Sequence, residues 1–436
     1  MPLRLPERIE GIRRWLTQGF WAVTDQGLFA ISNLALNILL ARWLTPYEYG
    51  AFGLAFAVFL LIGALHQATL IEPMLVFGAG KHKGHLSEYI GALVYVHSGF
   101  AILASSALLV AGLGFGLWGS SALSVALLAL ALTGPFILLL WLMRRACYAC
   151  SEPQLSASGG ACYMVLMVAG AYVLYWSGWL STATALGVTG ISSLVGSLWL
   201  MMRLRVKRPP LREGDLVRES LKDHWKYGRW SIANRGLGWV PHNAFYILLP
   251  IWGGLEAGAS FRALMNLFMP VLQANNSISV LLLPAFVRAR ERPTFGSRVG
   301  LAMIPFVLVS LVYWVVLGIF HAPIIDLIYG GRYTEYAYLI WLLGLVPIAG
   351  CIKEVMAHSL RALERPDRLF LAYVFSAVVT GTLGTLCVYL WGVAGAGAGL
   401  ILAHGSAAIL VAMLLMVLCR QAFGGFVSVQ EDREGR

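Results

Sequence analysis

Long apolar segments separated by short polar ones run along the whole chain. A helix of ~20 apolar residues crosses the ~30 Å hydrocarbon layer of a membrane and satisfies its own backbone hydrogen bonds. The pattern therefore predicts an all-α polytopic membrane protein with about twelve transmembrane helices. We place them at 17–42, 48–76, 89–117, 121–146, 156–177, 181–203, 226–250, 257–286, 298–320, 336–359, 368–390 and 393–419.

Basic residues are distributed unevenly among the polar segments. They gather in the N-terminal tail, in every second loop, as at Lys81 and Lys83, and in the C-terminal tail. The other loops hold little beyond Arg42 and Arg332. Lysine and arginine are enriched in cytoplasmic loops, so both termini are predicted to be cytoplasmic. The expected location is the bacterial inner (plasma) membrane, which the chain crosses many times.

The longest polar stretch, 203–226, lies near the middle of the chain and contains Pro209-Pro210. We interpret it as a linker between two six-helix halves. Glu48 and Glu256 stand in similar sequences 208 residues apart (256 − 48), and two further matches follow at similar offsets. Parallel repeats of this kind share a cavity at their interface. The predicted parts are a cytoplasmic tail (1–16), an N-terminal lobe (17–203), a cytoplasmic linker (204–225), a C-terminal lobe (226–419) and a cytoplasmic tail (420–436).

Composition excludes several classes of function. Charged residues are only 12% of the chain, and its formal net charge is +11. The basic residues lie between apolar segments rather than on one face with stacking aromatics, so nucleic acid is not an expected partner. Cys147 and Cys150 form a CxxC without a second pair or a histidine ligand, so no metal site is predicted. No P-loop occurs, so neither a nucleotide nor any other cofactor is expected, and we do not expect an enzyme.

Three segments carry a family resemblance. The sequence from Asn33 to Gly50 is similar to an LARxLxPxEYG opening. Residues 325–333 are similar to an LLYGxxY segment, and residues 360–366 to an LxAxGRP turn, with Glu364 in place of the usual glycine. In this order and spacing they resemble the polysaccharide (Wzx-type, oligosaccharide) flippases of the multidrug/oligosaccharidyl-lipid/polysaccharide (MOP) transporter superfamily.

The resemblance implies a MATE-like fold with two six-helix lobes in a V-shaped bundle. It also implies a flippase that moves a polyprenyl-diphosphate-linked oligosaccharide from the cytoplasmic to the periplasmic leaflet, for lipopolysaccharide or exopolysaccharide biosynthesis. The expected partners are then the lipid-linked oligosaccharide, membrane lipids and H+ or Na+. A polysaccharide polymerase and chain-length proteins are further expected partners.

Charges inside the hydrocarbon identify candidate binding residues, because each costs ~2.5–3.5 kcal/mol on insertion scales. Arg235 is the strongest candidate for a diphosphate or an anionic sugar, since about nine residues at 1.5 Å place it ~13 Å inside its helix. Arg229 and Arg262 lie nearer helix ends, where arginine can reach the headgroups. Lys353 can bind the substrate or neutralise a partner on another helix, and we place its neighbour Glu354 on a different helical face. The remaining candidates are Asn234 and His242, which lie in the polar helix around Pro241.

Two acidic residues, Asp25 and Glu72, lie in the first two helices. Asp25 is the candidate ion-coupling residue. In drug/cation antiporters of the same superfamily an acidic residue of the first helix couples transport to ions. The repeat offset (25 + 208 = 233) places Asp25 at a level near Arg235. The alternative is that Asp25 is the counter-ion of an arginine.

Other functions stay open at this point. An ion-coupled small-molecule exporter of cations needs buried carboxylates, whereas the predicted spans hold four cations and few acids. A membrane enzyme such as a glycan polymerase usually needs a longer extracytoplasmic loop than 321–335. A membrane subunit of an exopolysaccharide secretion complex, built on the same fold, is a further alternative.

Overall fold

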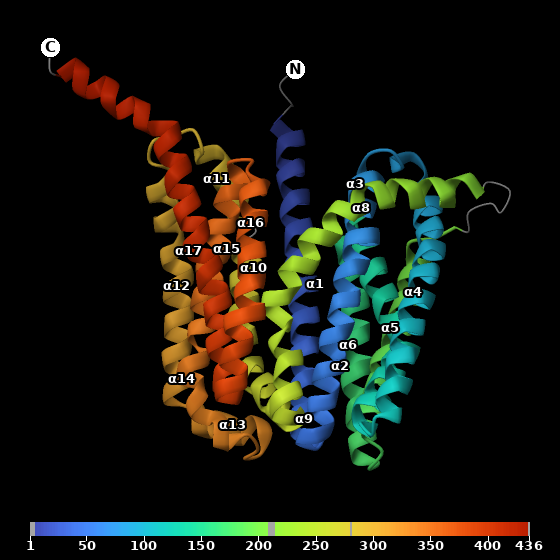
Figure 1. Ribbon diagram of the computed structural model, residues 1–436. Coiled ribbons are helices and arrows are strands. Elements are labelled where there is room, and N and C mark those ends of the chain that lie inside the picture. Colours follow the sequence, from blue (N-terminus) through green and yellow to red (C-terminus); the bar gives the residue numbers. More distant parts are fainter. Residues whose placement is uncertain (1–4, 208–213, 280, 435–436) are drawn as a thin grey trace. The chain divides into compact units, whose positions relative to one another are not determined.

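The apolar segments form helices throughout the computed structural model, which describes residues 5–207, 214–279 and 281–434 (Figure 1). No strand occurs among these residues. Eleven helical segments in the described part of the chain are long and apolar enough to span a membrane. The residues form two units, Met1–Gly236 and Leu237–Arg436.

The last of these segments, Asp367–Leu418, contains two of the predicted helices. Gly392 interrupts it with a φ of 53°, a backbone conformation that glycine adopts without steric cost. A Cβ on Gly395 would lie 1.9 Å from the carbonyl oxygen of Cys387, so the chain turns back tightly. After the turn, the carbonyl of Ala403 accepts a 2.7 Å hydrogen bond from Ser376, which precedes it. The segment therefore crosses the membrane twice, and the predicted all-α polytopic fold with about twelve spans is confirmed.

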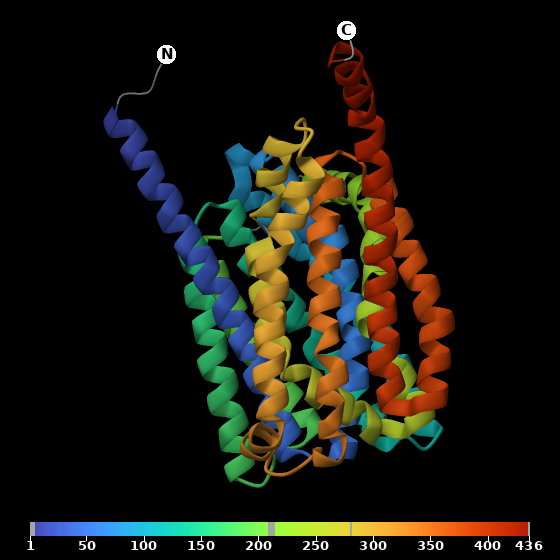
Figure 2. The same ribbon diagram turned by 90° about the vertical axis from the view of Figure 1, so that its left-hand side faces the viewer.

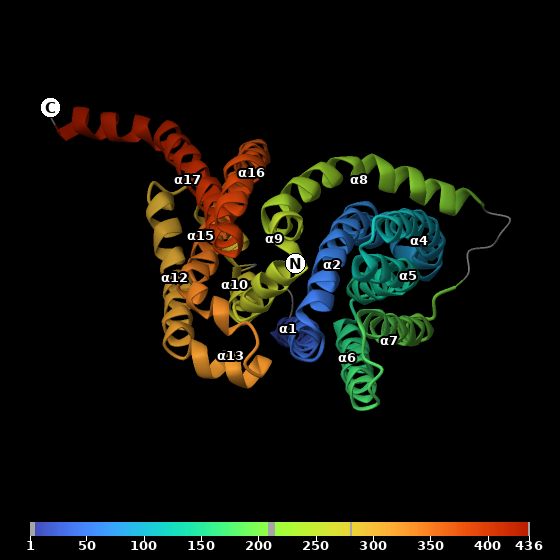
Figure 3. The ribbon, with the colours of Figure 1, turned by 60° about the horizontal axis from the view of Figure 1, so that its bottom comes forward.

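The first unit is organised around a central helix, α5. It packs against α4, α7 and α2, as Figure 3 shows, while α1 runs along α6 (Figure 2). A capping box between Thr45 and Glu48, with Pro46 in the first turn, starts α2. The elements are α1 (Leu5–Trp43), α2 (Pro46–His66), η1 (Gln67–Ile71), α3 (Glu72–Ala79), η2 (Lys83–His85), α4 (Leu86–Leu117), α5 (Ser121–Ala149), α6 (Pro153–Trp176), α7 (Thr182–Arg203) and the larger part of α8 (Gly214–Asn243).

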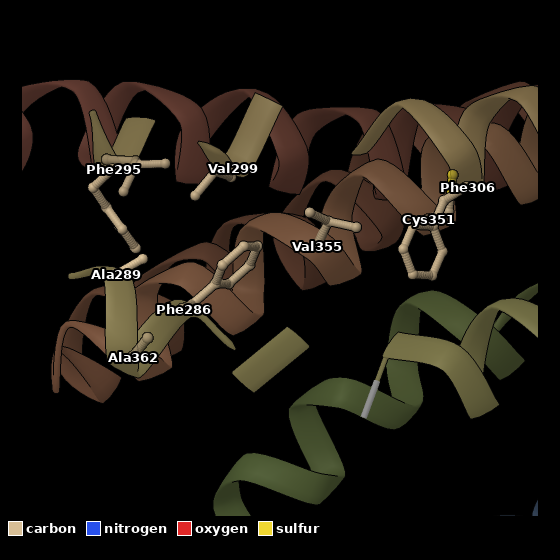
Figure 4. Close-up of a cluster of buried hydrophobic side chains, with 9 residues drawn as sticks. Phe286, Ala289, Phe295, Val299, Phe306, Cys351, Val355 and Ala362 are labelled. Atoms are coloured by element: carbon tan, nitrogen blue, oxygen red, sulfur yellow. The ribbon is translucent and has the colours of Figure 1, made fainter. Parts of the chain in front are cut away.

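The second unit contains more short helices. They are α9 (Phe245–Asn266), α10 (Met269–Ser279), α11 (Leu282–Ala289), α12 (Phe295–Ile319), α13 (His321–Tyr329), η3 (Thr334–Leu339), α14 (Ile340–Leu343), α15 (Leu345–Ala362), α16 (Pro366–Val379), η4 (Thr380–Gly384) and α17 (Thr385–Glu434). A buried cluster from α11, α12 and α15 includes Phe286, Phe295 and Val355, and it packs these helices together (Figure 4).

Several predicted elements differ from the structure. The helix predicted at 257–286 is divided into the end of α9, α10 and α11. Pro270 and Pro284 lie in the first turns of α10 and α11, where proline's missing N–H breaks no helical hydrogen bond.

The predicted linker at 204–225 is helical from Gly214 onward, and the two units divide inside α8. Helix likewise extends into the predicted tails, from Leu5 in α1 and to Glu434 in α17. Parts of the predicted linker and tails, residues 1–4, 208–213 and 435–436, lie outside the described residues.

Candidate functional site

Arg235 on α8 forms a charged cluster with the end of α2 and the start of α3. Its Nε donates to Oε1 of Glu72 at 2.7 Å, and its Nη2 donates to the same oxygen. Its Nη1 donates to the amide oxygen of Gln67 at 2.6 Å. Ser231, one turn earlier on α8, donates to the second oxygen of Glu72. The arginine is therefore held by two acceptors, and both oxygens of the carboxylate are engaged.

A π-helical turn, η1, places these two acceptors together. The backbone N–H of Glu72 donates to the carbonyl of Gln67, five residues earlier, which is the hydrogen bond of a π-turn. Residues five apart in an α-helix point about 140° away from each other. The wider π-turn brings Gln67 and Glu72 onto the same face, where both reach Arg235.

One face of α8 packs closely on this π-turn. A Cβ on Gly228 would lie 3.0 Å from the carbonyl oxygen of Ala68, so glycine allows the two backbones to approach. Nδ1 of His224 lies 2.9 Å from the carbonyl oxygen of Thr69, and its Nε2 lies 2.7 Å from the hydroxyl of Tyr89. The Thr69 carbonyl can only accept, so His224 carries its proton on Nδ1. These contacts set the position of Arg235 relative to Glu72.

Asp25 is fully buried and forms a second cluster. Its Oδ1 accepts hydrogen bonds from Nε of Arg144 at 3.1 Å and from Nη2 at 2.8 Å. Its Oδ2 accepts one from the hydroxyl of Tyr148 at 2.8 Å. The guanidinium of Arg144 also lies 4.0 Å over the ring of Phe29. Asp25 is thus the counter-ion of an arginine, as the alternative interpretation of the sequence held, and the arginine is Arg144 of α5.

The second unit holds two of the predicted cations. Lys353 is buried, and its Nζ lies 3.3 Å from Oε1 of Glu354. Placing these neighbours on different helical faces was wrong for their charged ends, because the four-carbon lysine stem reaches around the helix. Arg262 is buried as well, with its guanidinium 5.7 Å from the ring centre of Tyr246.

His242 joins the surroundings of Lys353. Its ring centre lies 4.7 Å from that of His404, edge to face, and the charge of Lys353 acts on both rings. Arg229 and Asn234 lie on exposed parts of α8. The predicted site residues are therefore divided among clusters: Arg235 and Asp25 in two separate ones of the first unit, Lys353 and His242 in one of the second.

Sequence reasoning missed several members of these clusters. Gln67, Arg144, Tyr148 and His404 were not among the candidates for a binding or coupling role. Glu72 was the available signal in the sequence, because an acid inside an apolar segment requires a basic partner and each intramembrane arginine requires an acidic one. Within the described residues no group of three or more histidine, cysteine or acidic side chains could hold a metal ion.

The order and packing of the helices define a class of fold, that of the MATE family transporters of the MOP superfamily. An inward-facing multidrug resistance MATE transporter is similar over 92% of this chain and 98% of its own, with a TM-score of 0.78 and 14% identity. An outward-facing structure of a multidrug resistance MATE transporter covers 94% and 96%, with a TM-score of 0.64 and 15% identity.

A MOP superfamily transporter from Pyrococcus furiosus Vc1, described as having a binding pocket of reverse polarity, also covers 94% and 96% (TM-score 0.63, 15% identity). No protein-family model matches the sequence. No curated protein matches it.

Proposed function

We propose that this protein is a secondary transporter that flips a polyprenyl-diphosphate-linked oligosaccharide from the cytoplasmic to the periplasmic leaflet of a bacterial inner membrane. The proposal rests on one observation, the ion pair between Arg235 and Glu72. A carboxylate presents two acceptor oxygens to a guanidinium much as a phosphate does. Glu72 therefore stands where an anionic substrate group would bind and acts as an internal substitute for it.

The exposure of the pair supports exchange with a substrate. The side chain of Arg235 is 39% exposed and that of Glu72 is 29% exposed, so a ligand can reach both. A diphosphate carries more charge and more acceptor oxygens than one carboxylate, and guanidinium binds it in bidentate fashion. A substrate that displaces Glu72 shifts the transporter toward the state in which Arg235 is free of that carboxylate.

Asp25 is the proposed coupling residue. Protonation of this buried carboxylate would remove the charge that holds Arg144 and so release α1 from α5. One charge moving through 100 mV supplies ~2.3 kcal/mol, which is enough to bias such a switch. Asp25→Asn should slow turnover while substrate still binds. An unchanged rate, with the same response to a collapsed proton or sodium gradient, would leave Asp25 as a structural counter-ion only.

The second candidate is an ion-coupled exporter of small molecules, which is favoured by the fold shared with multidrug resistance MATE transporters. The charges favour the anionic substrate. Asp25, Glu72 and Glu354 each contact a basic side chain, so a cationic drug would have to displace an internal cation from any of them. The fold neighbour described as having a pocket of reverse polarity also supports a substrate unlike those of the drug exporters.

The test is a flipping assay in proteoliposomes. A fluorescent short-chain polyprenyl-diphosphate oligosaccharide is loaded in one leaflet, and its arrival in the other is followed by an impermeant quencher. Arg235→Ala should lower the rate at least tenfold, and Arg235→Lys should restore part of it, because the fork geometry is lost. Glu72→Gln should tighten substrate binding, because the competing carboxylate is gone.

Two controls accompany these variants. The double variant Glu72→Gln/Arg235→Ala leaves no unpaired charge and reports on folding. Arg298→Ala removes an exposed arginine at the start of α12, whose Nε bonds Thr294, and should flip normally. Wild-type flipping by Arg235→Ala, together with efflux of a cationic dye by the native protein, would replace the flippase with the exporter.

A further inference from the structure

The first half of α8, residues 214–229, has three differently composed sectors around its axis. The inward sector carries Ser220, His224 and Gly228, which are buried. They follow one another at four-residue spacing, so they lie on one face. This face packs on the π-turn η1 and on Tyr89 of α4. In Figure 1 this half of the helix lies across the ends of α3 and α4.

The second sector is acidic and faces the polar loop after α3. Glu219 and Asp223 both contact Nζ of Lys81, with 2.7 Å to Oδ2 of Asp223. Lys81 lies between the end of α3 and the start of η2, beyond both membrane segments. The two acidic partners raise the pKa of Lys81 and keep it charged. The acidic sector therefore points toward water.

The third sector is apolar at one edge and basic at the other. Leu221 is 53% exposed and Trp225 is 61% exposed. At about 100° per residue they lie on the side of α8 roughly opposite the acidic sector, and therefore toward the hydrocarbon. Exposed Arg218, Lys222 and Lys226 follow next around the helix.

We propose that this half of α8 is an interfacial helix that binds the anionic phospholipids of the membrane surface. Leu221 and Trp225 enter the boundary between headgroups and acyl chains, where tryptophan is enriched, and the basic edge contacts the lipid phosphates. The order of the sectors matches a bilayer, in which hydrocarbon, phosphate and water follow one another in depth. The site is independent of the transported substrate, because none of these five side chains belongs to the Arg235 cluster.

The test is hydrogen exchange of the full-length protein in lipid nanodiscs, followed on the peptide 216–229. Nanodiscs of phosphatidylcholine alone are compared with ones containing about 30% phosphatidylglycerol. Protection of this peptide should be higher with the anionic lipid, since each basic residue near such a surface strengthens binding roughly fivefold. Lys222→Glu/Lys226→Glu should remove the difference, which amounts to roughly 25-fold in local opening. Peptides from α5 serve as the internal reference for folding.

The matched control is Arg288→Glu/Arg292→Glu, two exposed arginines at and beyond the end of α11. It should keep the lipid dependence of the α8 peptide. Trp225→Ser should reduce protection in both kinds of nanodisc, because it removes the apolar anchor. Equal exchange in neutral and anionic nanodiscs, or loss of the difference in the control double variant, would overturn the proposal.

Discussion

The buried pair of Asp25 and Arg144 makes a quantitative prediction about stability. Arg144→Ala removes three hydrogen bonds to Asp25, two to Oδ1 and one at 3.3 Å to its main-chain carbonyl. The side chain of Asp25 is only 1% exposed, so water cannot replace the lost cation. Breaking a buried ion pair from one side costs about 3–5 kcal/mol.

The first unit is large enough that 1 kcal/mol corresponds to about 2–4 °C in Tm. We therefore expect Arg144→Ala to lower the Tm by roughly 10 °C in detergent, followed by intrinsic fluorescence. Tyr148→Phe removes one hydrogen bond to the same carboxylate and should cost about 1.5–3 kcal/mol.

The neighbouring arginine supplies a control. Arg145 lies on the same helix, is only half-buried, and places its guanidinium 5.4 Å from the ring centre of Tyr148. Such a contact contributes about 1 kcal/mol, so Arg145→Ala should shift the Tm by a few degrees. Asp25→Asn/Arg144→Met buries no charge and should recover most of the lost stability. The reasoning is refuted if Arg144→Ala and Arg145→Ala behave alike, or if the double variant equals the sum of its single variants.

Three further predictions concern other parts of the molecule. Gly395→Ala should prevent folding to a stable protein, because its Cβ would enter the backbone of the preceding helix. Gly405→Ala has nothing within 4 Å of the added methyl and should be as stable as the wild type or slightly more so. Thermal unfolding of the two variants compares them directly. Burial lowers the pKa of His224 to about 4, below the value of ~6.5 in the unfolded chain. The contribution of the neutral imidazole to the free energy of unfolding is therefore complete above pH ~6.5. It falls by up to ~1.4 kcal/mol per pH unit as the pH drops toward 4. His224→Gln should flatten that dependence in Tm measured against pH. Lys207→Cys should resist an impermeant thiol reagent added from the periplasmic side. Ser177→Cys, directly after α6 at the edge of a predicted periplasmic loop, should react; the reverse result would invert the predicted topology.

The helices could be predicted from the sequence because an apolar segment of membrane length is a local property. The depth of Arg235 was counted from a predicted helix start at 226 and stays a prediction, because α8 begins at Gly214 and its apolar segment at Ser231. The partners of Arg235 could not be predicted, since Glu72 is 163 residues away and Gln67 is 168 residues away along the chain. Two charges can occupy similar levels in a membrane without facing each other. The repeat offset therefore related Asp25 to Arg235, whereas its actual partner, Arg144, lies on α5.

The breaks in the helices were only partly predictable. Pro270 and Pro284 were available signals for the division of the segment 257–286, although proline in the first turn is also compatible with a continuous apolar segment. The extension of α8 into the predicted linker follows from tertiary contacts. The linker sequence is polar, and its helix is held by Tyr89 and by the π-turn, which are distant in sequence.

The π-turn between α2 and α3 has a consequence for how this chain can vary in length. Such a turn contains one residue more than the α-helical turn it replaces. Deleting one residue of 68–71 would therefore close a regular α-helical turn, in which Gln67 and Glu72 stand four residues apart, about 40° from each other around the helix axis. Both side chains would still face Arg235, and the helix that follows would keep its orientation. A related chain that is one residue shorter at this turn would thus keep the ion pair, whereas an alignment drawn without a gap here would pair Glu72 with the wrong residue.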